Sequence, residues 1–440
     1  MGATLPKPVV ATVLERHGTT DFCVGLAEMN GWRTNMEDAH VVHVHNGEGY
    51  FGILDGHGGA ECSEWCSKRI QEQLTANGCP SSQAAAKKLC IDVDREFLET
   101  GLPGGSTAAM CIVRAPTGIG GKYKIHVINA GDSRVLLSRA DGSIVDGGGT
   151  DSGLTVDHKP NHPSERERIE RCGGSVVEAA GGVHRVNGNL AVSRGFGDAD
   201  CKKTGGPAPE DRPVTADPEH FFFECGPTDF VMLVCDGVSE GNFPNPEVTQ
   251  LAAKVLKETG GDAAKASEAV CFRAVETGSK DNISCMIVLM GGAASAGSAP
   301  IRMGVQREFN AGSLIGCDKS SFVKAYIAMC ARGGVTLAEA AEMRHTLLVS
   351  RQGKPDATDD DDAELEAIGE PEGPPGSAER KAWFEAWAQN CQERGNGGGG
   401  DDEDDGDGPS LGGGSATEQL AMMRMLLGMM QAQQGGPGGA

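Results

Sequence analysis

Carboxylates stand beside the strand-like apolar runs of this chain, at positions where they could hold metal ions. Asp55 ends the run YFGILD, Asp236 ends FVMLVCD, and Asp281 precedes NISCMIVLM; Glu37 and Asp38 stand just before AHVVHVH. A carboxylate at the end of an apolar strand is costly unless it is solvated, paired or metal-bound. Hard divalent cations prefer oxygen ligands, and two of them about 3.5–4 Å apart can activate a shared water.

Each of these pieces also has an ordinary interpretation. An Asp-Gly pair is usually a turn, and Glu37-Asp38 could be a polar entry into a strand. The glycines after Asp55 and Asp236 are expected to let the backbone turn sharply. Cys172-Gly173-Gly174 is better explained as the end of a helix than as a loop that cradles phosphate around a nucleophilic cysteine. The metal interpretation therefore depends on the joint occurrence of the four segments.

The elements that must position these side chains come in blocks of strands and blocks of helices. Apolar patterns predict strands at 22–29, 39–45, 49–55, 106–114, 123–130, 133–139, 230–236 and 282–290, and helices at 59–76, 81–100, 246–258 and 262–277. Blocks favour an α+β fold over a doubly wound parallel sheet. We expect a central β-sandwich of two mainly antiparallel sheets with α-helices on both outer sides.

Eight motifs stand in the chain in a recognisable order: GWRTNMEDAH (31–40), YFGILDGHGG (50–59), GGSTAAM (104–110), NAGDSRVLL (129–137), DHKP (157–160), GNLAVSRGFGD (188–198), CDG (235–237) and GSKDNIS (278–284). With this set the chain resembles the PPM family, the type 2C protein phosphatases, over about residues 20–291. The resemblance implies a metal-dependent phosphatase that hydrolyses phosphoserine and phosphothreonine by direct attack of a hydroxide bridging two Mg²⁺ or Mn²⁺ ions. It also implies the fold expected above.

The resemblance assigns roles to individual residues. The first ion is expected on Asp55, Asp236 and Asp281, and the second on Glu37, Asp55 and the carbonyl of Gly56. Arg33 matches the arginine that binds phosphate, a role that suits a planar and permanently charged guanidinium. His57 matches the general acid that protonates the leaving alkoxide, and the alternative is a histidine that only orders the metal site.

Further positions are expected to support this centre. Asp157 matches a residue that, with Asp236, binds a third and weaker ion in some members, and its alternative is a plain turn or cap residue. Asp38 and Glu240 are expected to support the ligands without binding the ions. After Asp236-Gly237 the family usually has an aromatic residue and then Asp, but this chain has Val238-Ser239-Glu240. The resemblance therefore does not fix the affinity of the site for metal ions. Asp132 with Arg134, and Arg194 with Asp198, are expected as structural ion pairs or turn residues.

Composition limits the partners and the compartment. The net charge is −23, which argues against nucleic acid and anionic membranes as partners. The chain shows no secretory signal or stretch apolar enough to span a membrane, so its 15 cysteines are expected to be reduced in the cytoplasm or nucleus. Myristoylation of Gly2 would add weak membrane contact, although Pro6 departs from the acceptor pattern. We expect a monomer that acts on phosphorylated proteins.

Composition also divides the chain into a lead segment (1–21), a catalytic domain (22–291), a linker with a helical extension (292–355) and an acidic, Gly-rich tail (356–440). Helices are expected at 318–332 and 336–350, and the acidic stretches TDDDDAELE and GGGGDDEDDGDG are expected to be low-complexity and solvated. The tail ends in a Met-rich helix candidate at 416–433, which could dock on a protein partner or fold back on the catalytic domain.

Two rival functions remain open at this point. A catalytically inactive family member could serve as a binding scaffold, but such a protein typically lacks the metal carboxylates that this chain keeps. An active enzyme could also prefer a small phosphorylated metabolite, which a deep and closed pocket would favour over an open cleft.

Overall fold

The apolar runs of the sequence form the strands of two antiparallel sheets. The computed structural model describes residues 4–118, 120–239, 241–292, 303–354 and 358–397. The first sheet has six strands in the spatial order β16 (Gly304–Asn310), β1 (Thr4–Gly18), β2 (Phe22–Arg33), β15 (Ile283–Met290), β14 (Phe230–Val234) and β9 (Arg134–Ser138). The second has five, in the order β13 (Glu219–Cys225), β8 (Tyr123–Ala130), β7 (Ala108–Arg114), β4 (Glu48–Leu54) and β3 (Ala39–His45).

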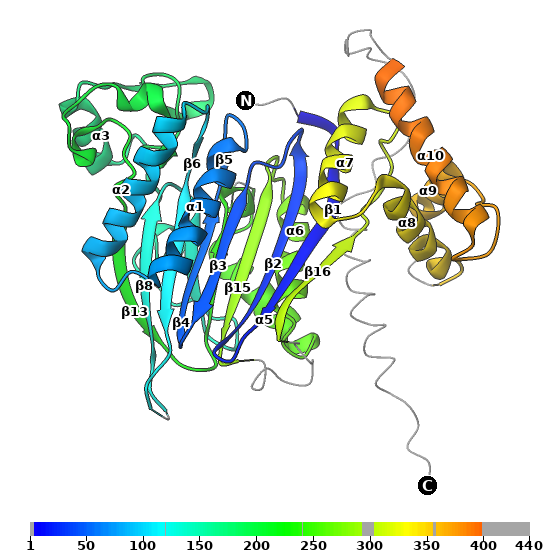
Figure 1. The fold of residues 1–440 in the computed structure, drawn as a ribbon, viewed down its shortest axis with the longest axis horizontal. Helices are drawn as coiled ribbons and strands as arrows, with labels where there is room; N and C mark the ends of the chain where they lie inside the picture. Colours follow the sequence, from blue (N-terminus) through cyan, green and yellow to red (C-terminus); the bar gives the residue numbers. More distant parts are fainter. Residues whose placement is uncertain (1–3, 119, 240, 293–302, 355–357, 398–440) are drawn as a thin grey trace.

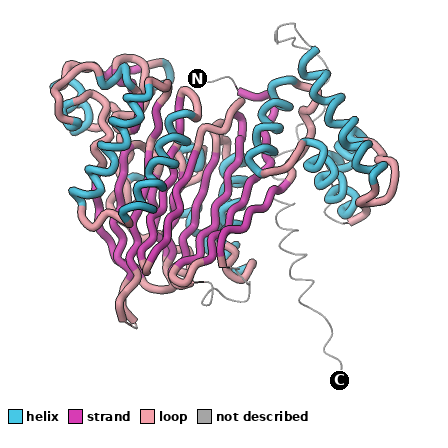
Figure 2. The backbone as a smooth tube through the Cα atoms, viewed as in Figure 1, coloured by secondary structure: helices cyan, strands magenta, loops and turns pink. Residues whose placement is uncertain are grey.

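The two sheets pack face to face, which confirms the expected sandwich (Figures 1 and 2). Val24 and Leu26 of β2 share one buried apolar cluster with Phe51 and Ile53 of β4. Strands β14 and β15 are apolar along nearly their whole length because one face meets the other sheet and the opposite face meets helices.

Helices cover both outer faces, as expected. The five-stranded sheet carries α1 (Glu61–Asn77) and α2 (Gln83–Thr100), and the six-stranded sheet carries α5 (Asn245–Glu258) and α6 (Ala263–Glu276). Ser82 caps α2 by accepting from the amide of Ala85, and Asp262 caps α6 by accepting from the amides of Ala264 and Lys265. These side-chain caps fix where both helices begin.

Short elements lie beside this frame. They are β5 (Gly56–His57), β6 (Gly105–Ser106) and β12 (Phe196–Gly197), which form a small sheet; β10 (Val176–Glu178) and β11 (His184–Val186); α3 (Pro163–Arg171) and α4 (Asp236–Ser239); and the 3-10 turns Thr150–Ser152, Ala180–Gly182, Ala199–Lys202 and Pro209–Asp211.

The boundaries of the central sheet differ from the division drawn on the sequence. Most of the expected lead segment forms β1, which lies between β2 and β16. Strand β16 belongs to the expected linker and extension, and it pairs with β1 from Thr12↔Asn310 to Gly18↔Gly304. Two segments outside the expected domain of 22–291 therefore complete its sheet.

The extension continues as a helical bundle next to β1. It consists of α7 (Ser320–Gly333), α8 (Leu337–Arg351), α9 (Asp359–Ile368) and α10 (Ala378–Gly397). The acidic stretch expected as spacer forms α9 instead, because Thr358 caps it and buried arginines neutralise two of its acids: Arg344 pairs with Glu364, and Arg351 pairs with Asp361. The Met-rich candidate at 416–433 and the acidic run at 401–405 lie outside the described residues.

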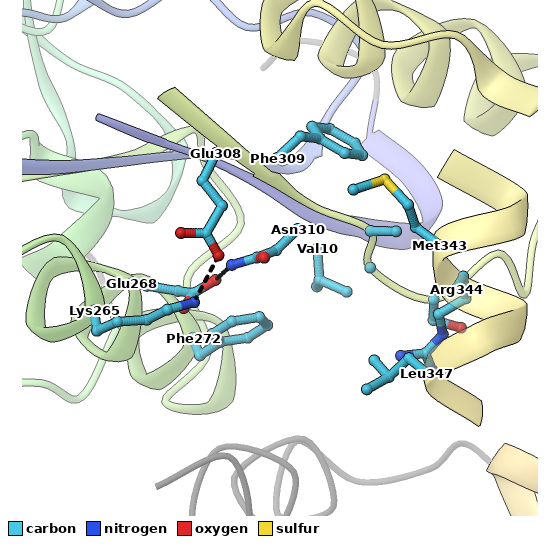
Figure 3. A pocket seen from close by; sticks show the side chains of 13 residues that line it. Val10, Lys265, Glu268, Phe272, Glu308, Phe309, Asn310, Met343, Arg344 and Leu347 are labelled. Carbon is cyan, nitrogen blue, oxygen red and sulfur yellow. Dashed lines mark hydrogen bonds and ion pairs between the residues drawn. The ribbon is translucent and has the colours of Figure 1, made fainter. Parts of the chain in front are cut away.

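A cavity of about 340 Å³ separates the bundle from α6 (Figure 3). Apolar side chains from both parts line it, among them Phe272 of α6 and Met343 and Leu347 of α8. Across the described part of the chain, we find no helix that combines the length and the apolar character needed to cross a bilayer.

Candidate active site

The strand ends bring the predicted carboxylates together. Asp55 follows β4, and the pairing of Leu54 with Ala39 places the Glu37-Asp38 segment beside it. In the other sheet, Asp236 follows β14 and Asp281 precedes the neighbouring β15. The charges of Asp236, Asp38 and Asp281 all act on Asp55, so both sheets contribute to one acidic cluster.

The cluster has the electrostatics of a cation site. Burial, together with the charge of Asp236, raises the pKa of Asp55 well above its usual range. Burial and the charges of Asp132 and Asp281 raise the pKa of Asp236 to about 8. Carboxylates this close together ionise more readily once positive charge lies among them. An all-oxygen donor set is the one that Mg²⁺ and Mn²⁺ prefer, so the residues present fit such ions.

Two glycines allow the backbone segments around the acidic cluster to approach one another closely. A Cβ added to Gly56 would overlap the carbonyl oxygen of Glu37, and one added to Gly237 would overlap the carbonyl oxygen of Asn282. Neither glycine has a positive φ. We expected these glycines to allow sharp turns, but their role is to allow two backbones to approach closely.

Asn282 holds the surrounding segments in register. Its side-chain amide donates to the carbonyls of Asn30 (2.8 Å) and Asn35 (2.9 Å), and its Oδ1 accepts from the amide of Glu37 (2.9 Å). Asn282 is 5% exposed. A single buried amide therefore joins the end of β2, the Glu37 loop and the start of β15. From the sequence, Asn282 stood out only as part of the motif GSKDNIS.

Arg33 ends β2 at the rim of the cluster. Its Nη2 donates to Oδ2 of Asp281, and about a third of its side chain is exposed. The guanidinium therefore stands between the acids and solvent, where it can meet an incoming anion.

His57 pairs with Asp198, the acid that we expected beside Arg194. Its Nε2 lies 3.0 Å from both carboxylate oxygens of Asp198. Burial alone would lower the pKa of His57, but the hydrogen bond and charge of Asp198 raise it above its ordinary value. A Cβ added to Gly105 would overlap both partners, so only glycine fits beside this pair. Asp198 has a left-handed backbone (φ 53°), a conformation that Asp tolerates better than most residues.

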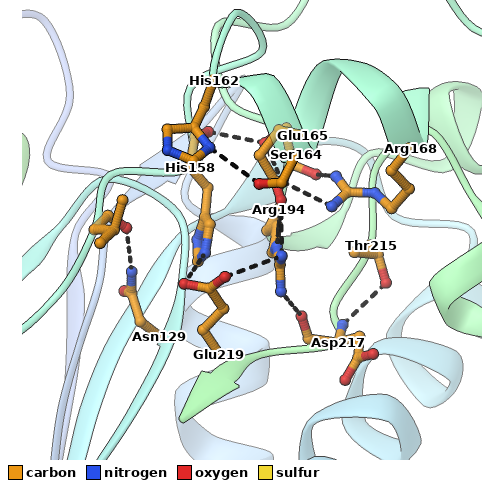
Figure 4. A network of polar contacts seen from close by, with 12 residues as sticks. Asn129, His158, His162, Ser164, Glu165, Arg168, Arg194, Thr215, Asp217 and Glu219 are labelled. Carbon is orange, nitrogen blue, oxygen red and sulfur yellow. Dashed lines mark hydrogen bonds and ion pairs between the residues drawn. The ribbon is translucent and has the colours of Figure 1, made fainter. Parts of the chain in front are cut away.

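The segment that carries Asp198 is fastened from two sides. Asp94 of α2 accepts from the amide of Gly197 (2.8 Å) and from Lys202 Nζ (2.6 Å). On the other side, Glu165 of α3 accepts from both Ser193 and Arg194 (Figure 4). Buried polar contacts therefore reinforce the pairing of β12 with β6 in presenting Asp198 to His57.

The two expected structural ion pairs are wrong in their partners. Arg194 pairs with Glu165 and Glu219 (Figure 4). Asp198 pairs with His57 instead. Asp132 pairs with Lys159, while Arg134 pairs with Asp157. Both expected pairs had their members close in sequence, whereas each observed pair joins residues at least 23 positions apart.

Asp157 offers both carboxylate oxygens to Arg134, at 3.0 Å from Nε and 2.9 Å from Nη2. Asp132 is the acid from this region whose charge acts on Asp236 and Asp55. The role of Asp157 at a third ion stays a prediction, and its observed contact is structural.

Asp38 lies behind the cluster, 1% exposed. Its Oδ2 accepts from Ser284 (2.7 Å), and its carbonyl accepts from Arg332 of α7 (2.6 Å). Its Oδ1 has no hydrogen-bond partner among the residues that the structure describes. This arrangement suits a residue that supports the site from beneath. Glu240, the other expected supporting acid, lies outside the described residues.

A second group of potential ligands lies apart from these acids. Within the described ranges, the three side chains whose ligand atoms all lie within 4.8 Å of one another are Glu15, His17 and His40, none of which was singled out from the sequence. The predicted carboxylates are not so tightly grouped, and a site for two ions distributes its ligands over two positions.

Comparison with known proteins places these residues in a wider context. The family model described as Protein phosphatase 2C matches residues 22–283. Protein phosphatase 1B of Rattus norvegicus is 31% identical over 316 residues, which cover 66% of this chain and 75% of that protein. Protein phosphatase 1A of Bos taurus is 30% identical over 318 residues, covering 66% and 76%.

Among solved structures, the crystal structure of a phosphatase from a pathogenic strain of Toxoplasma gondii has a TM-score of 0.57 at 27% identity, and the match covers 68% of this chain and 99% of that chain. The range matched by the family model contains every predicted ligand, as well as Arg33, His57 and Asp198.

Proposed function

Because the chain belongs to the protein phosphatase 2C family, we propose that it removes phosphate from phosphoserine and phosphothreonine in proteins by direct attack of water activated between two divalent ions. It is a metal-dependent serine/threonine protein phosphatase. The observation that carries the mechanistic proposal is the acidic cluster at the strand ends of both sheets. Mg²⁺ or Mn²⁺, when bound, would lower the pKa of a shared water and so supply the nucleophile.

The cluster divides naturally into two sets of ligands. Asp55, Asp236 and Asp281 would hold one ion, and Glu37, Asp55 and the Gly56 carbonyl would hold the other. The close approach of Gly56 to Glu37 supports the second set. The hydrogen-bonding contact between Asp55 and Asp236, together with the charge of Asp281 acting on both, supports the first.

Arg33 would bind the phosphoryl group. A planar guanidinium with several donors matches two phosphoryl oxygens at once, and the partial exposure of Arg33 leaves it open to substrate. Its contact with Asp281 orients it toward the acidic cluster. The positive charge would also balance charge that develops on the phosphoryl oxygens in the transition state.

His57 would protonate the departing serine or threonine oxygen. An alkoxide is a poor leaving group, so a nearby acid speeds its departure. Asp198 keeps the imidazole oriented by accepting from Nε2 and favours its protonated form. In this proposal Asp198 positions His57 and does not touch substrate.

The test measures turnover of a phosphothreonine peptide with Mn²⁺, with Mg²⁺ and with EDTA. Activity should require a divalent ion, and Asp236→Asn should lower kcat/KM by orders of magnitude because it removes a charge from the ion's ligand set. Asp92→Asn serves as the matched control, since Asp92 lies on α2 and pairs with Lys88 and Arg95 there. Undiminished turnover by Asp236→Asn would overturn its assigned role.

A further inference from the structure

Three side chains from two different sheets converge at the junction between the sandwich and the helical extension. Glu15 and His17 come from β1, and His40 comes from β3 at the edge of the other sheet. Oε2 of Glu15 lies 3.0 Å from Nε2 of His17 and 3.4 Å from Nε2 of His40. The Glu15 side chain is 4% exposed, and the two rings are 15% and 20% exposed.

The spacing of these atoms suits a tetrahedral ion. Zinc bonds to nitrogen and carboxylate oxygen are about 2.0–2.2 Å long, so neighbouring ligand atoms around a tetrahedral zinc lie roughly 3.3–3.6 Å apart. The observed separations of 3.0 and 3.4 Å lie near this range, and all three ligand atoms lie within 4.8 Å of one another. Two imidazoles and one carboxylate are also a ligand set that zinc uses, with water in the fourth position.

The groups around two of the three ligands, His40 and Glu15, are of the kind that hold a metal site in place. Nδ1 of His40 lies 3.0 Å from Oε1 of Glu28, a contact that fixes the ring and leaves Nε2 directed at Glu15. Oε1 of Glu15 accepts from Arg307 of β16, so its Oε2 is the oxygen that faces the rings. Histidine ligands in zinc sites commonly have such a carboxylate behind them.

The competing explanation for this arrangement is a proton on His40, with no metal ion bound. Burial alone would lower the pKa of His40, but the charges of Glu28 and Glu15 raise it to about 9. In that state the cluster is a set of ion pairs that also includes His17, Arg307 and, through Glu28, Arg332. A zinc ion would take the place of that proton, because a ligating imidazole must be deprotonated.

We propose that Glu15, His17 and His40 form a zinc site that is separate from the catalytic carboxylates and ties β1 of one sheet to β3 of the other. Its mixed nitrogen and oxygen donors favour Zn²⁺, whereas the all-oxygen catalytic cluster favours Mg²⁺ or Mn²⁺. The site is a structural cross-link at the edge of the sandwich, and it does not depend on the phosphatase mechanism proposed above.

The test uses full-length, metal-free protein carrying Asp236→Asn and Asp281→Asn, so that the catalytic carboxylates no longer compete. Calorimetric titration with Zn²⁺ should show one equivalent bound, and Co²⁺ in its place should give the intense visible absorption of a tetrahedral ion. In this background His17→Gln and His40→Gln should each weaken binding at least about tenfold. His43→Gln, on the same strand β3, is the matched control and should bind as the background does.

Two further readouts separate loss of a ligand from loss of the fold. Circular dichroism reports whether each variant is folded, and zinc should raise the thermal midpoint of the background protein but not that of the histidine variants. Absence of binding by the background protein, an octahedral Co²⁺ spectrum, or zinc binding that survives both histidine substitutions would each overturn the site.

Discussion

The contact between the helical extension and the floor of the active site gives the most demanding prediction. Arg332 of α7 donates to both carboxylate oxygens of Glu28 (2.8 and 3.0 Å) and to the carbonyl of Asp38 (2.6 Å). Glu28 is 2% exposed. Arg332→Met keeps much of the side chain's volume but leaves a buried carboxylate facing a thioether, so we expect the variant to be strongly destabilised.

The magnitude follows from the titration of Glu28. Burial alone would raise its pKa, but the charges of Arg332 and His40 lower it from 4.5 to about 2. That difference corresponds to roughly 3 kcal/mol, at about 1.4 kcal/mol for each tenfold change in the dissociation constant. Loss of one partner from a buried pair costs about 3–5 kcal/mol in other proteins, which agrees. Because His40 also lowers this pKa and remains beside Glu28, we expect Arg332→Met to lower the free energy of unfolding by at most about 3 kcal/mol.

The sign of the pH dependence is fixed by the direction of the shift. Because the pKa of Glu28 is lower in the folded protein, the stabilisation is complete above pH 4.5 and is lost as the pH falls toward 2. The difference between wild type and Arg332→Met should therefore be constant at neutral pH and should shrink below pH 4.5.

The assay is urea denaturation followed by circular dichroism, with Arg95→Met as the control. Arg95 pairs with Asp92 on the surface of α2 and is 59% exposed, so its loss should change stability by less than about 1 kcal/mol. Adding Glu28→Met to Arg332→Met should recover stability, since the uncompensated charge is gone. If Arg332→Met and Arg95→Met unfold at the same urea concentration, the reasoning about this buried pair is wrong.

Three further predictions concern the catalytic residues and the extension. Asp198→Asn should slow hydrolysis of a phosphothreonine peptide by about 100-fold but should spare p-nitrophenyl phosphate, whose good leaving group needs no acid from His57; equal losses on both substrates would contradict the positioning role. Gly237→Ala should raise the Mn²⁺ concentration needed for half-maximal activity, because its methyl group would push against the carbonyl of Asn282, and an unchanged metal requirement would contradict this. Truncation at residue 295 removes β16 and the bundle that covers β1, so it should lower the thermal midpoint and cause association seen by light scattering. A truncated protein that stays monomeric and has the same thermal midpoint as the full chain would contradict this prediction.

The positions of the carboxylates at strand ends could be predicted because the signal, an acid beside an apolar run, lies in adjacent residues. An acid directly after an apolar run stands at a strand end whatever the topology, and the antiparallel order then gathers such ends. Asp55, Asp236 and Asp281 were placed beside their strands for this reason, and the structure brings them together. Their role as ligands stays a prediction.

The partners of charged side chains could not be predicted in the same way. Asp132 and Arg134 stand two residues apart, a spacing that would place both on one face of a strand. Asp132, however, precedes β9, which begins at Arg134, so strand periodicity does not set its direction. Which cation meets which acid depends on loops that pack from elsewhere in the chain, as Lys159 does on Asp132. Asp198 was missed as the partner of His57 for the same reason, since 141 residues separate them.

The full set of strands in the six-stranded sheet also could not be predicted from local sequence patterns. Strand β16 has the sequence GVQREFN, in which only Phe309 is buried and the other positions are exposed or half-buried. Its membership of the sheet follows from pairing with β1, almost 300 residues earlier in the chain. Similarly, the acids of α9 are typical of a solvated run, and only the buried arginines of α8 make a packed helix of them.

The position of β16 has a consequence for biosynthesis. During translation, the ribosome releases β1 first and β16 only after all other strands of both sheets. Until then one edge of β1 displays unsatisfied amides and carbonyls, and edges of this kind recruit strands from other molecules. A nascent chain of this protein therefore needs protection from its neighbours on the same polysome until its last strand has emerged.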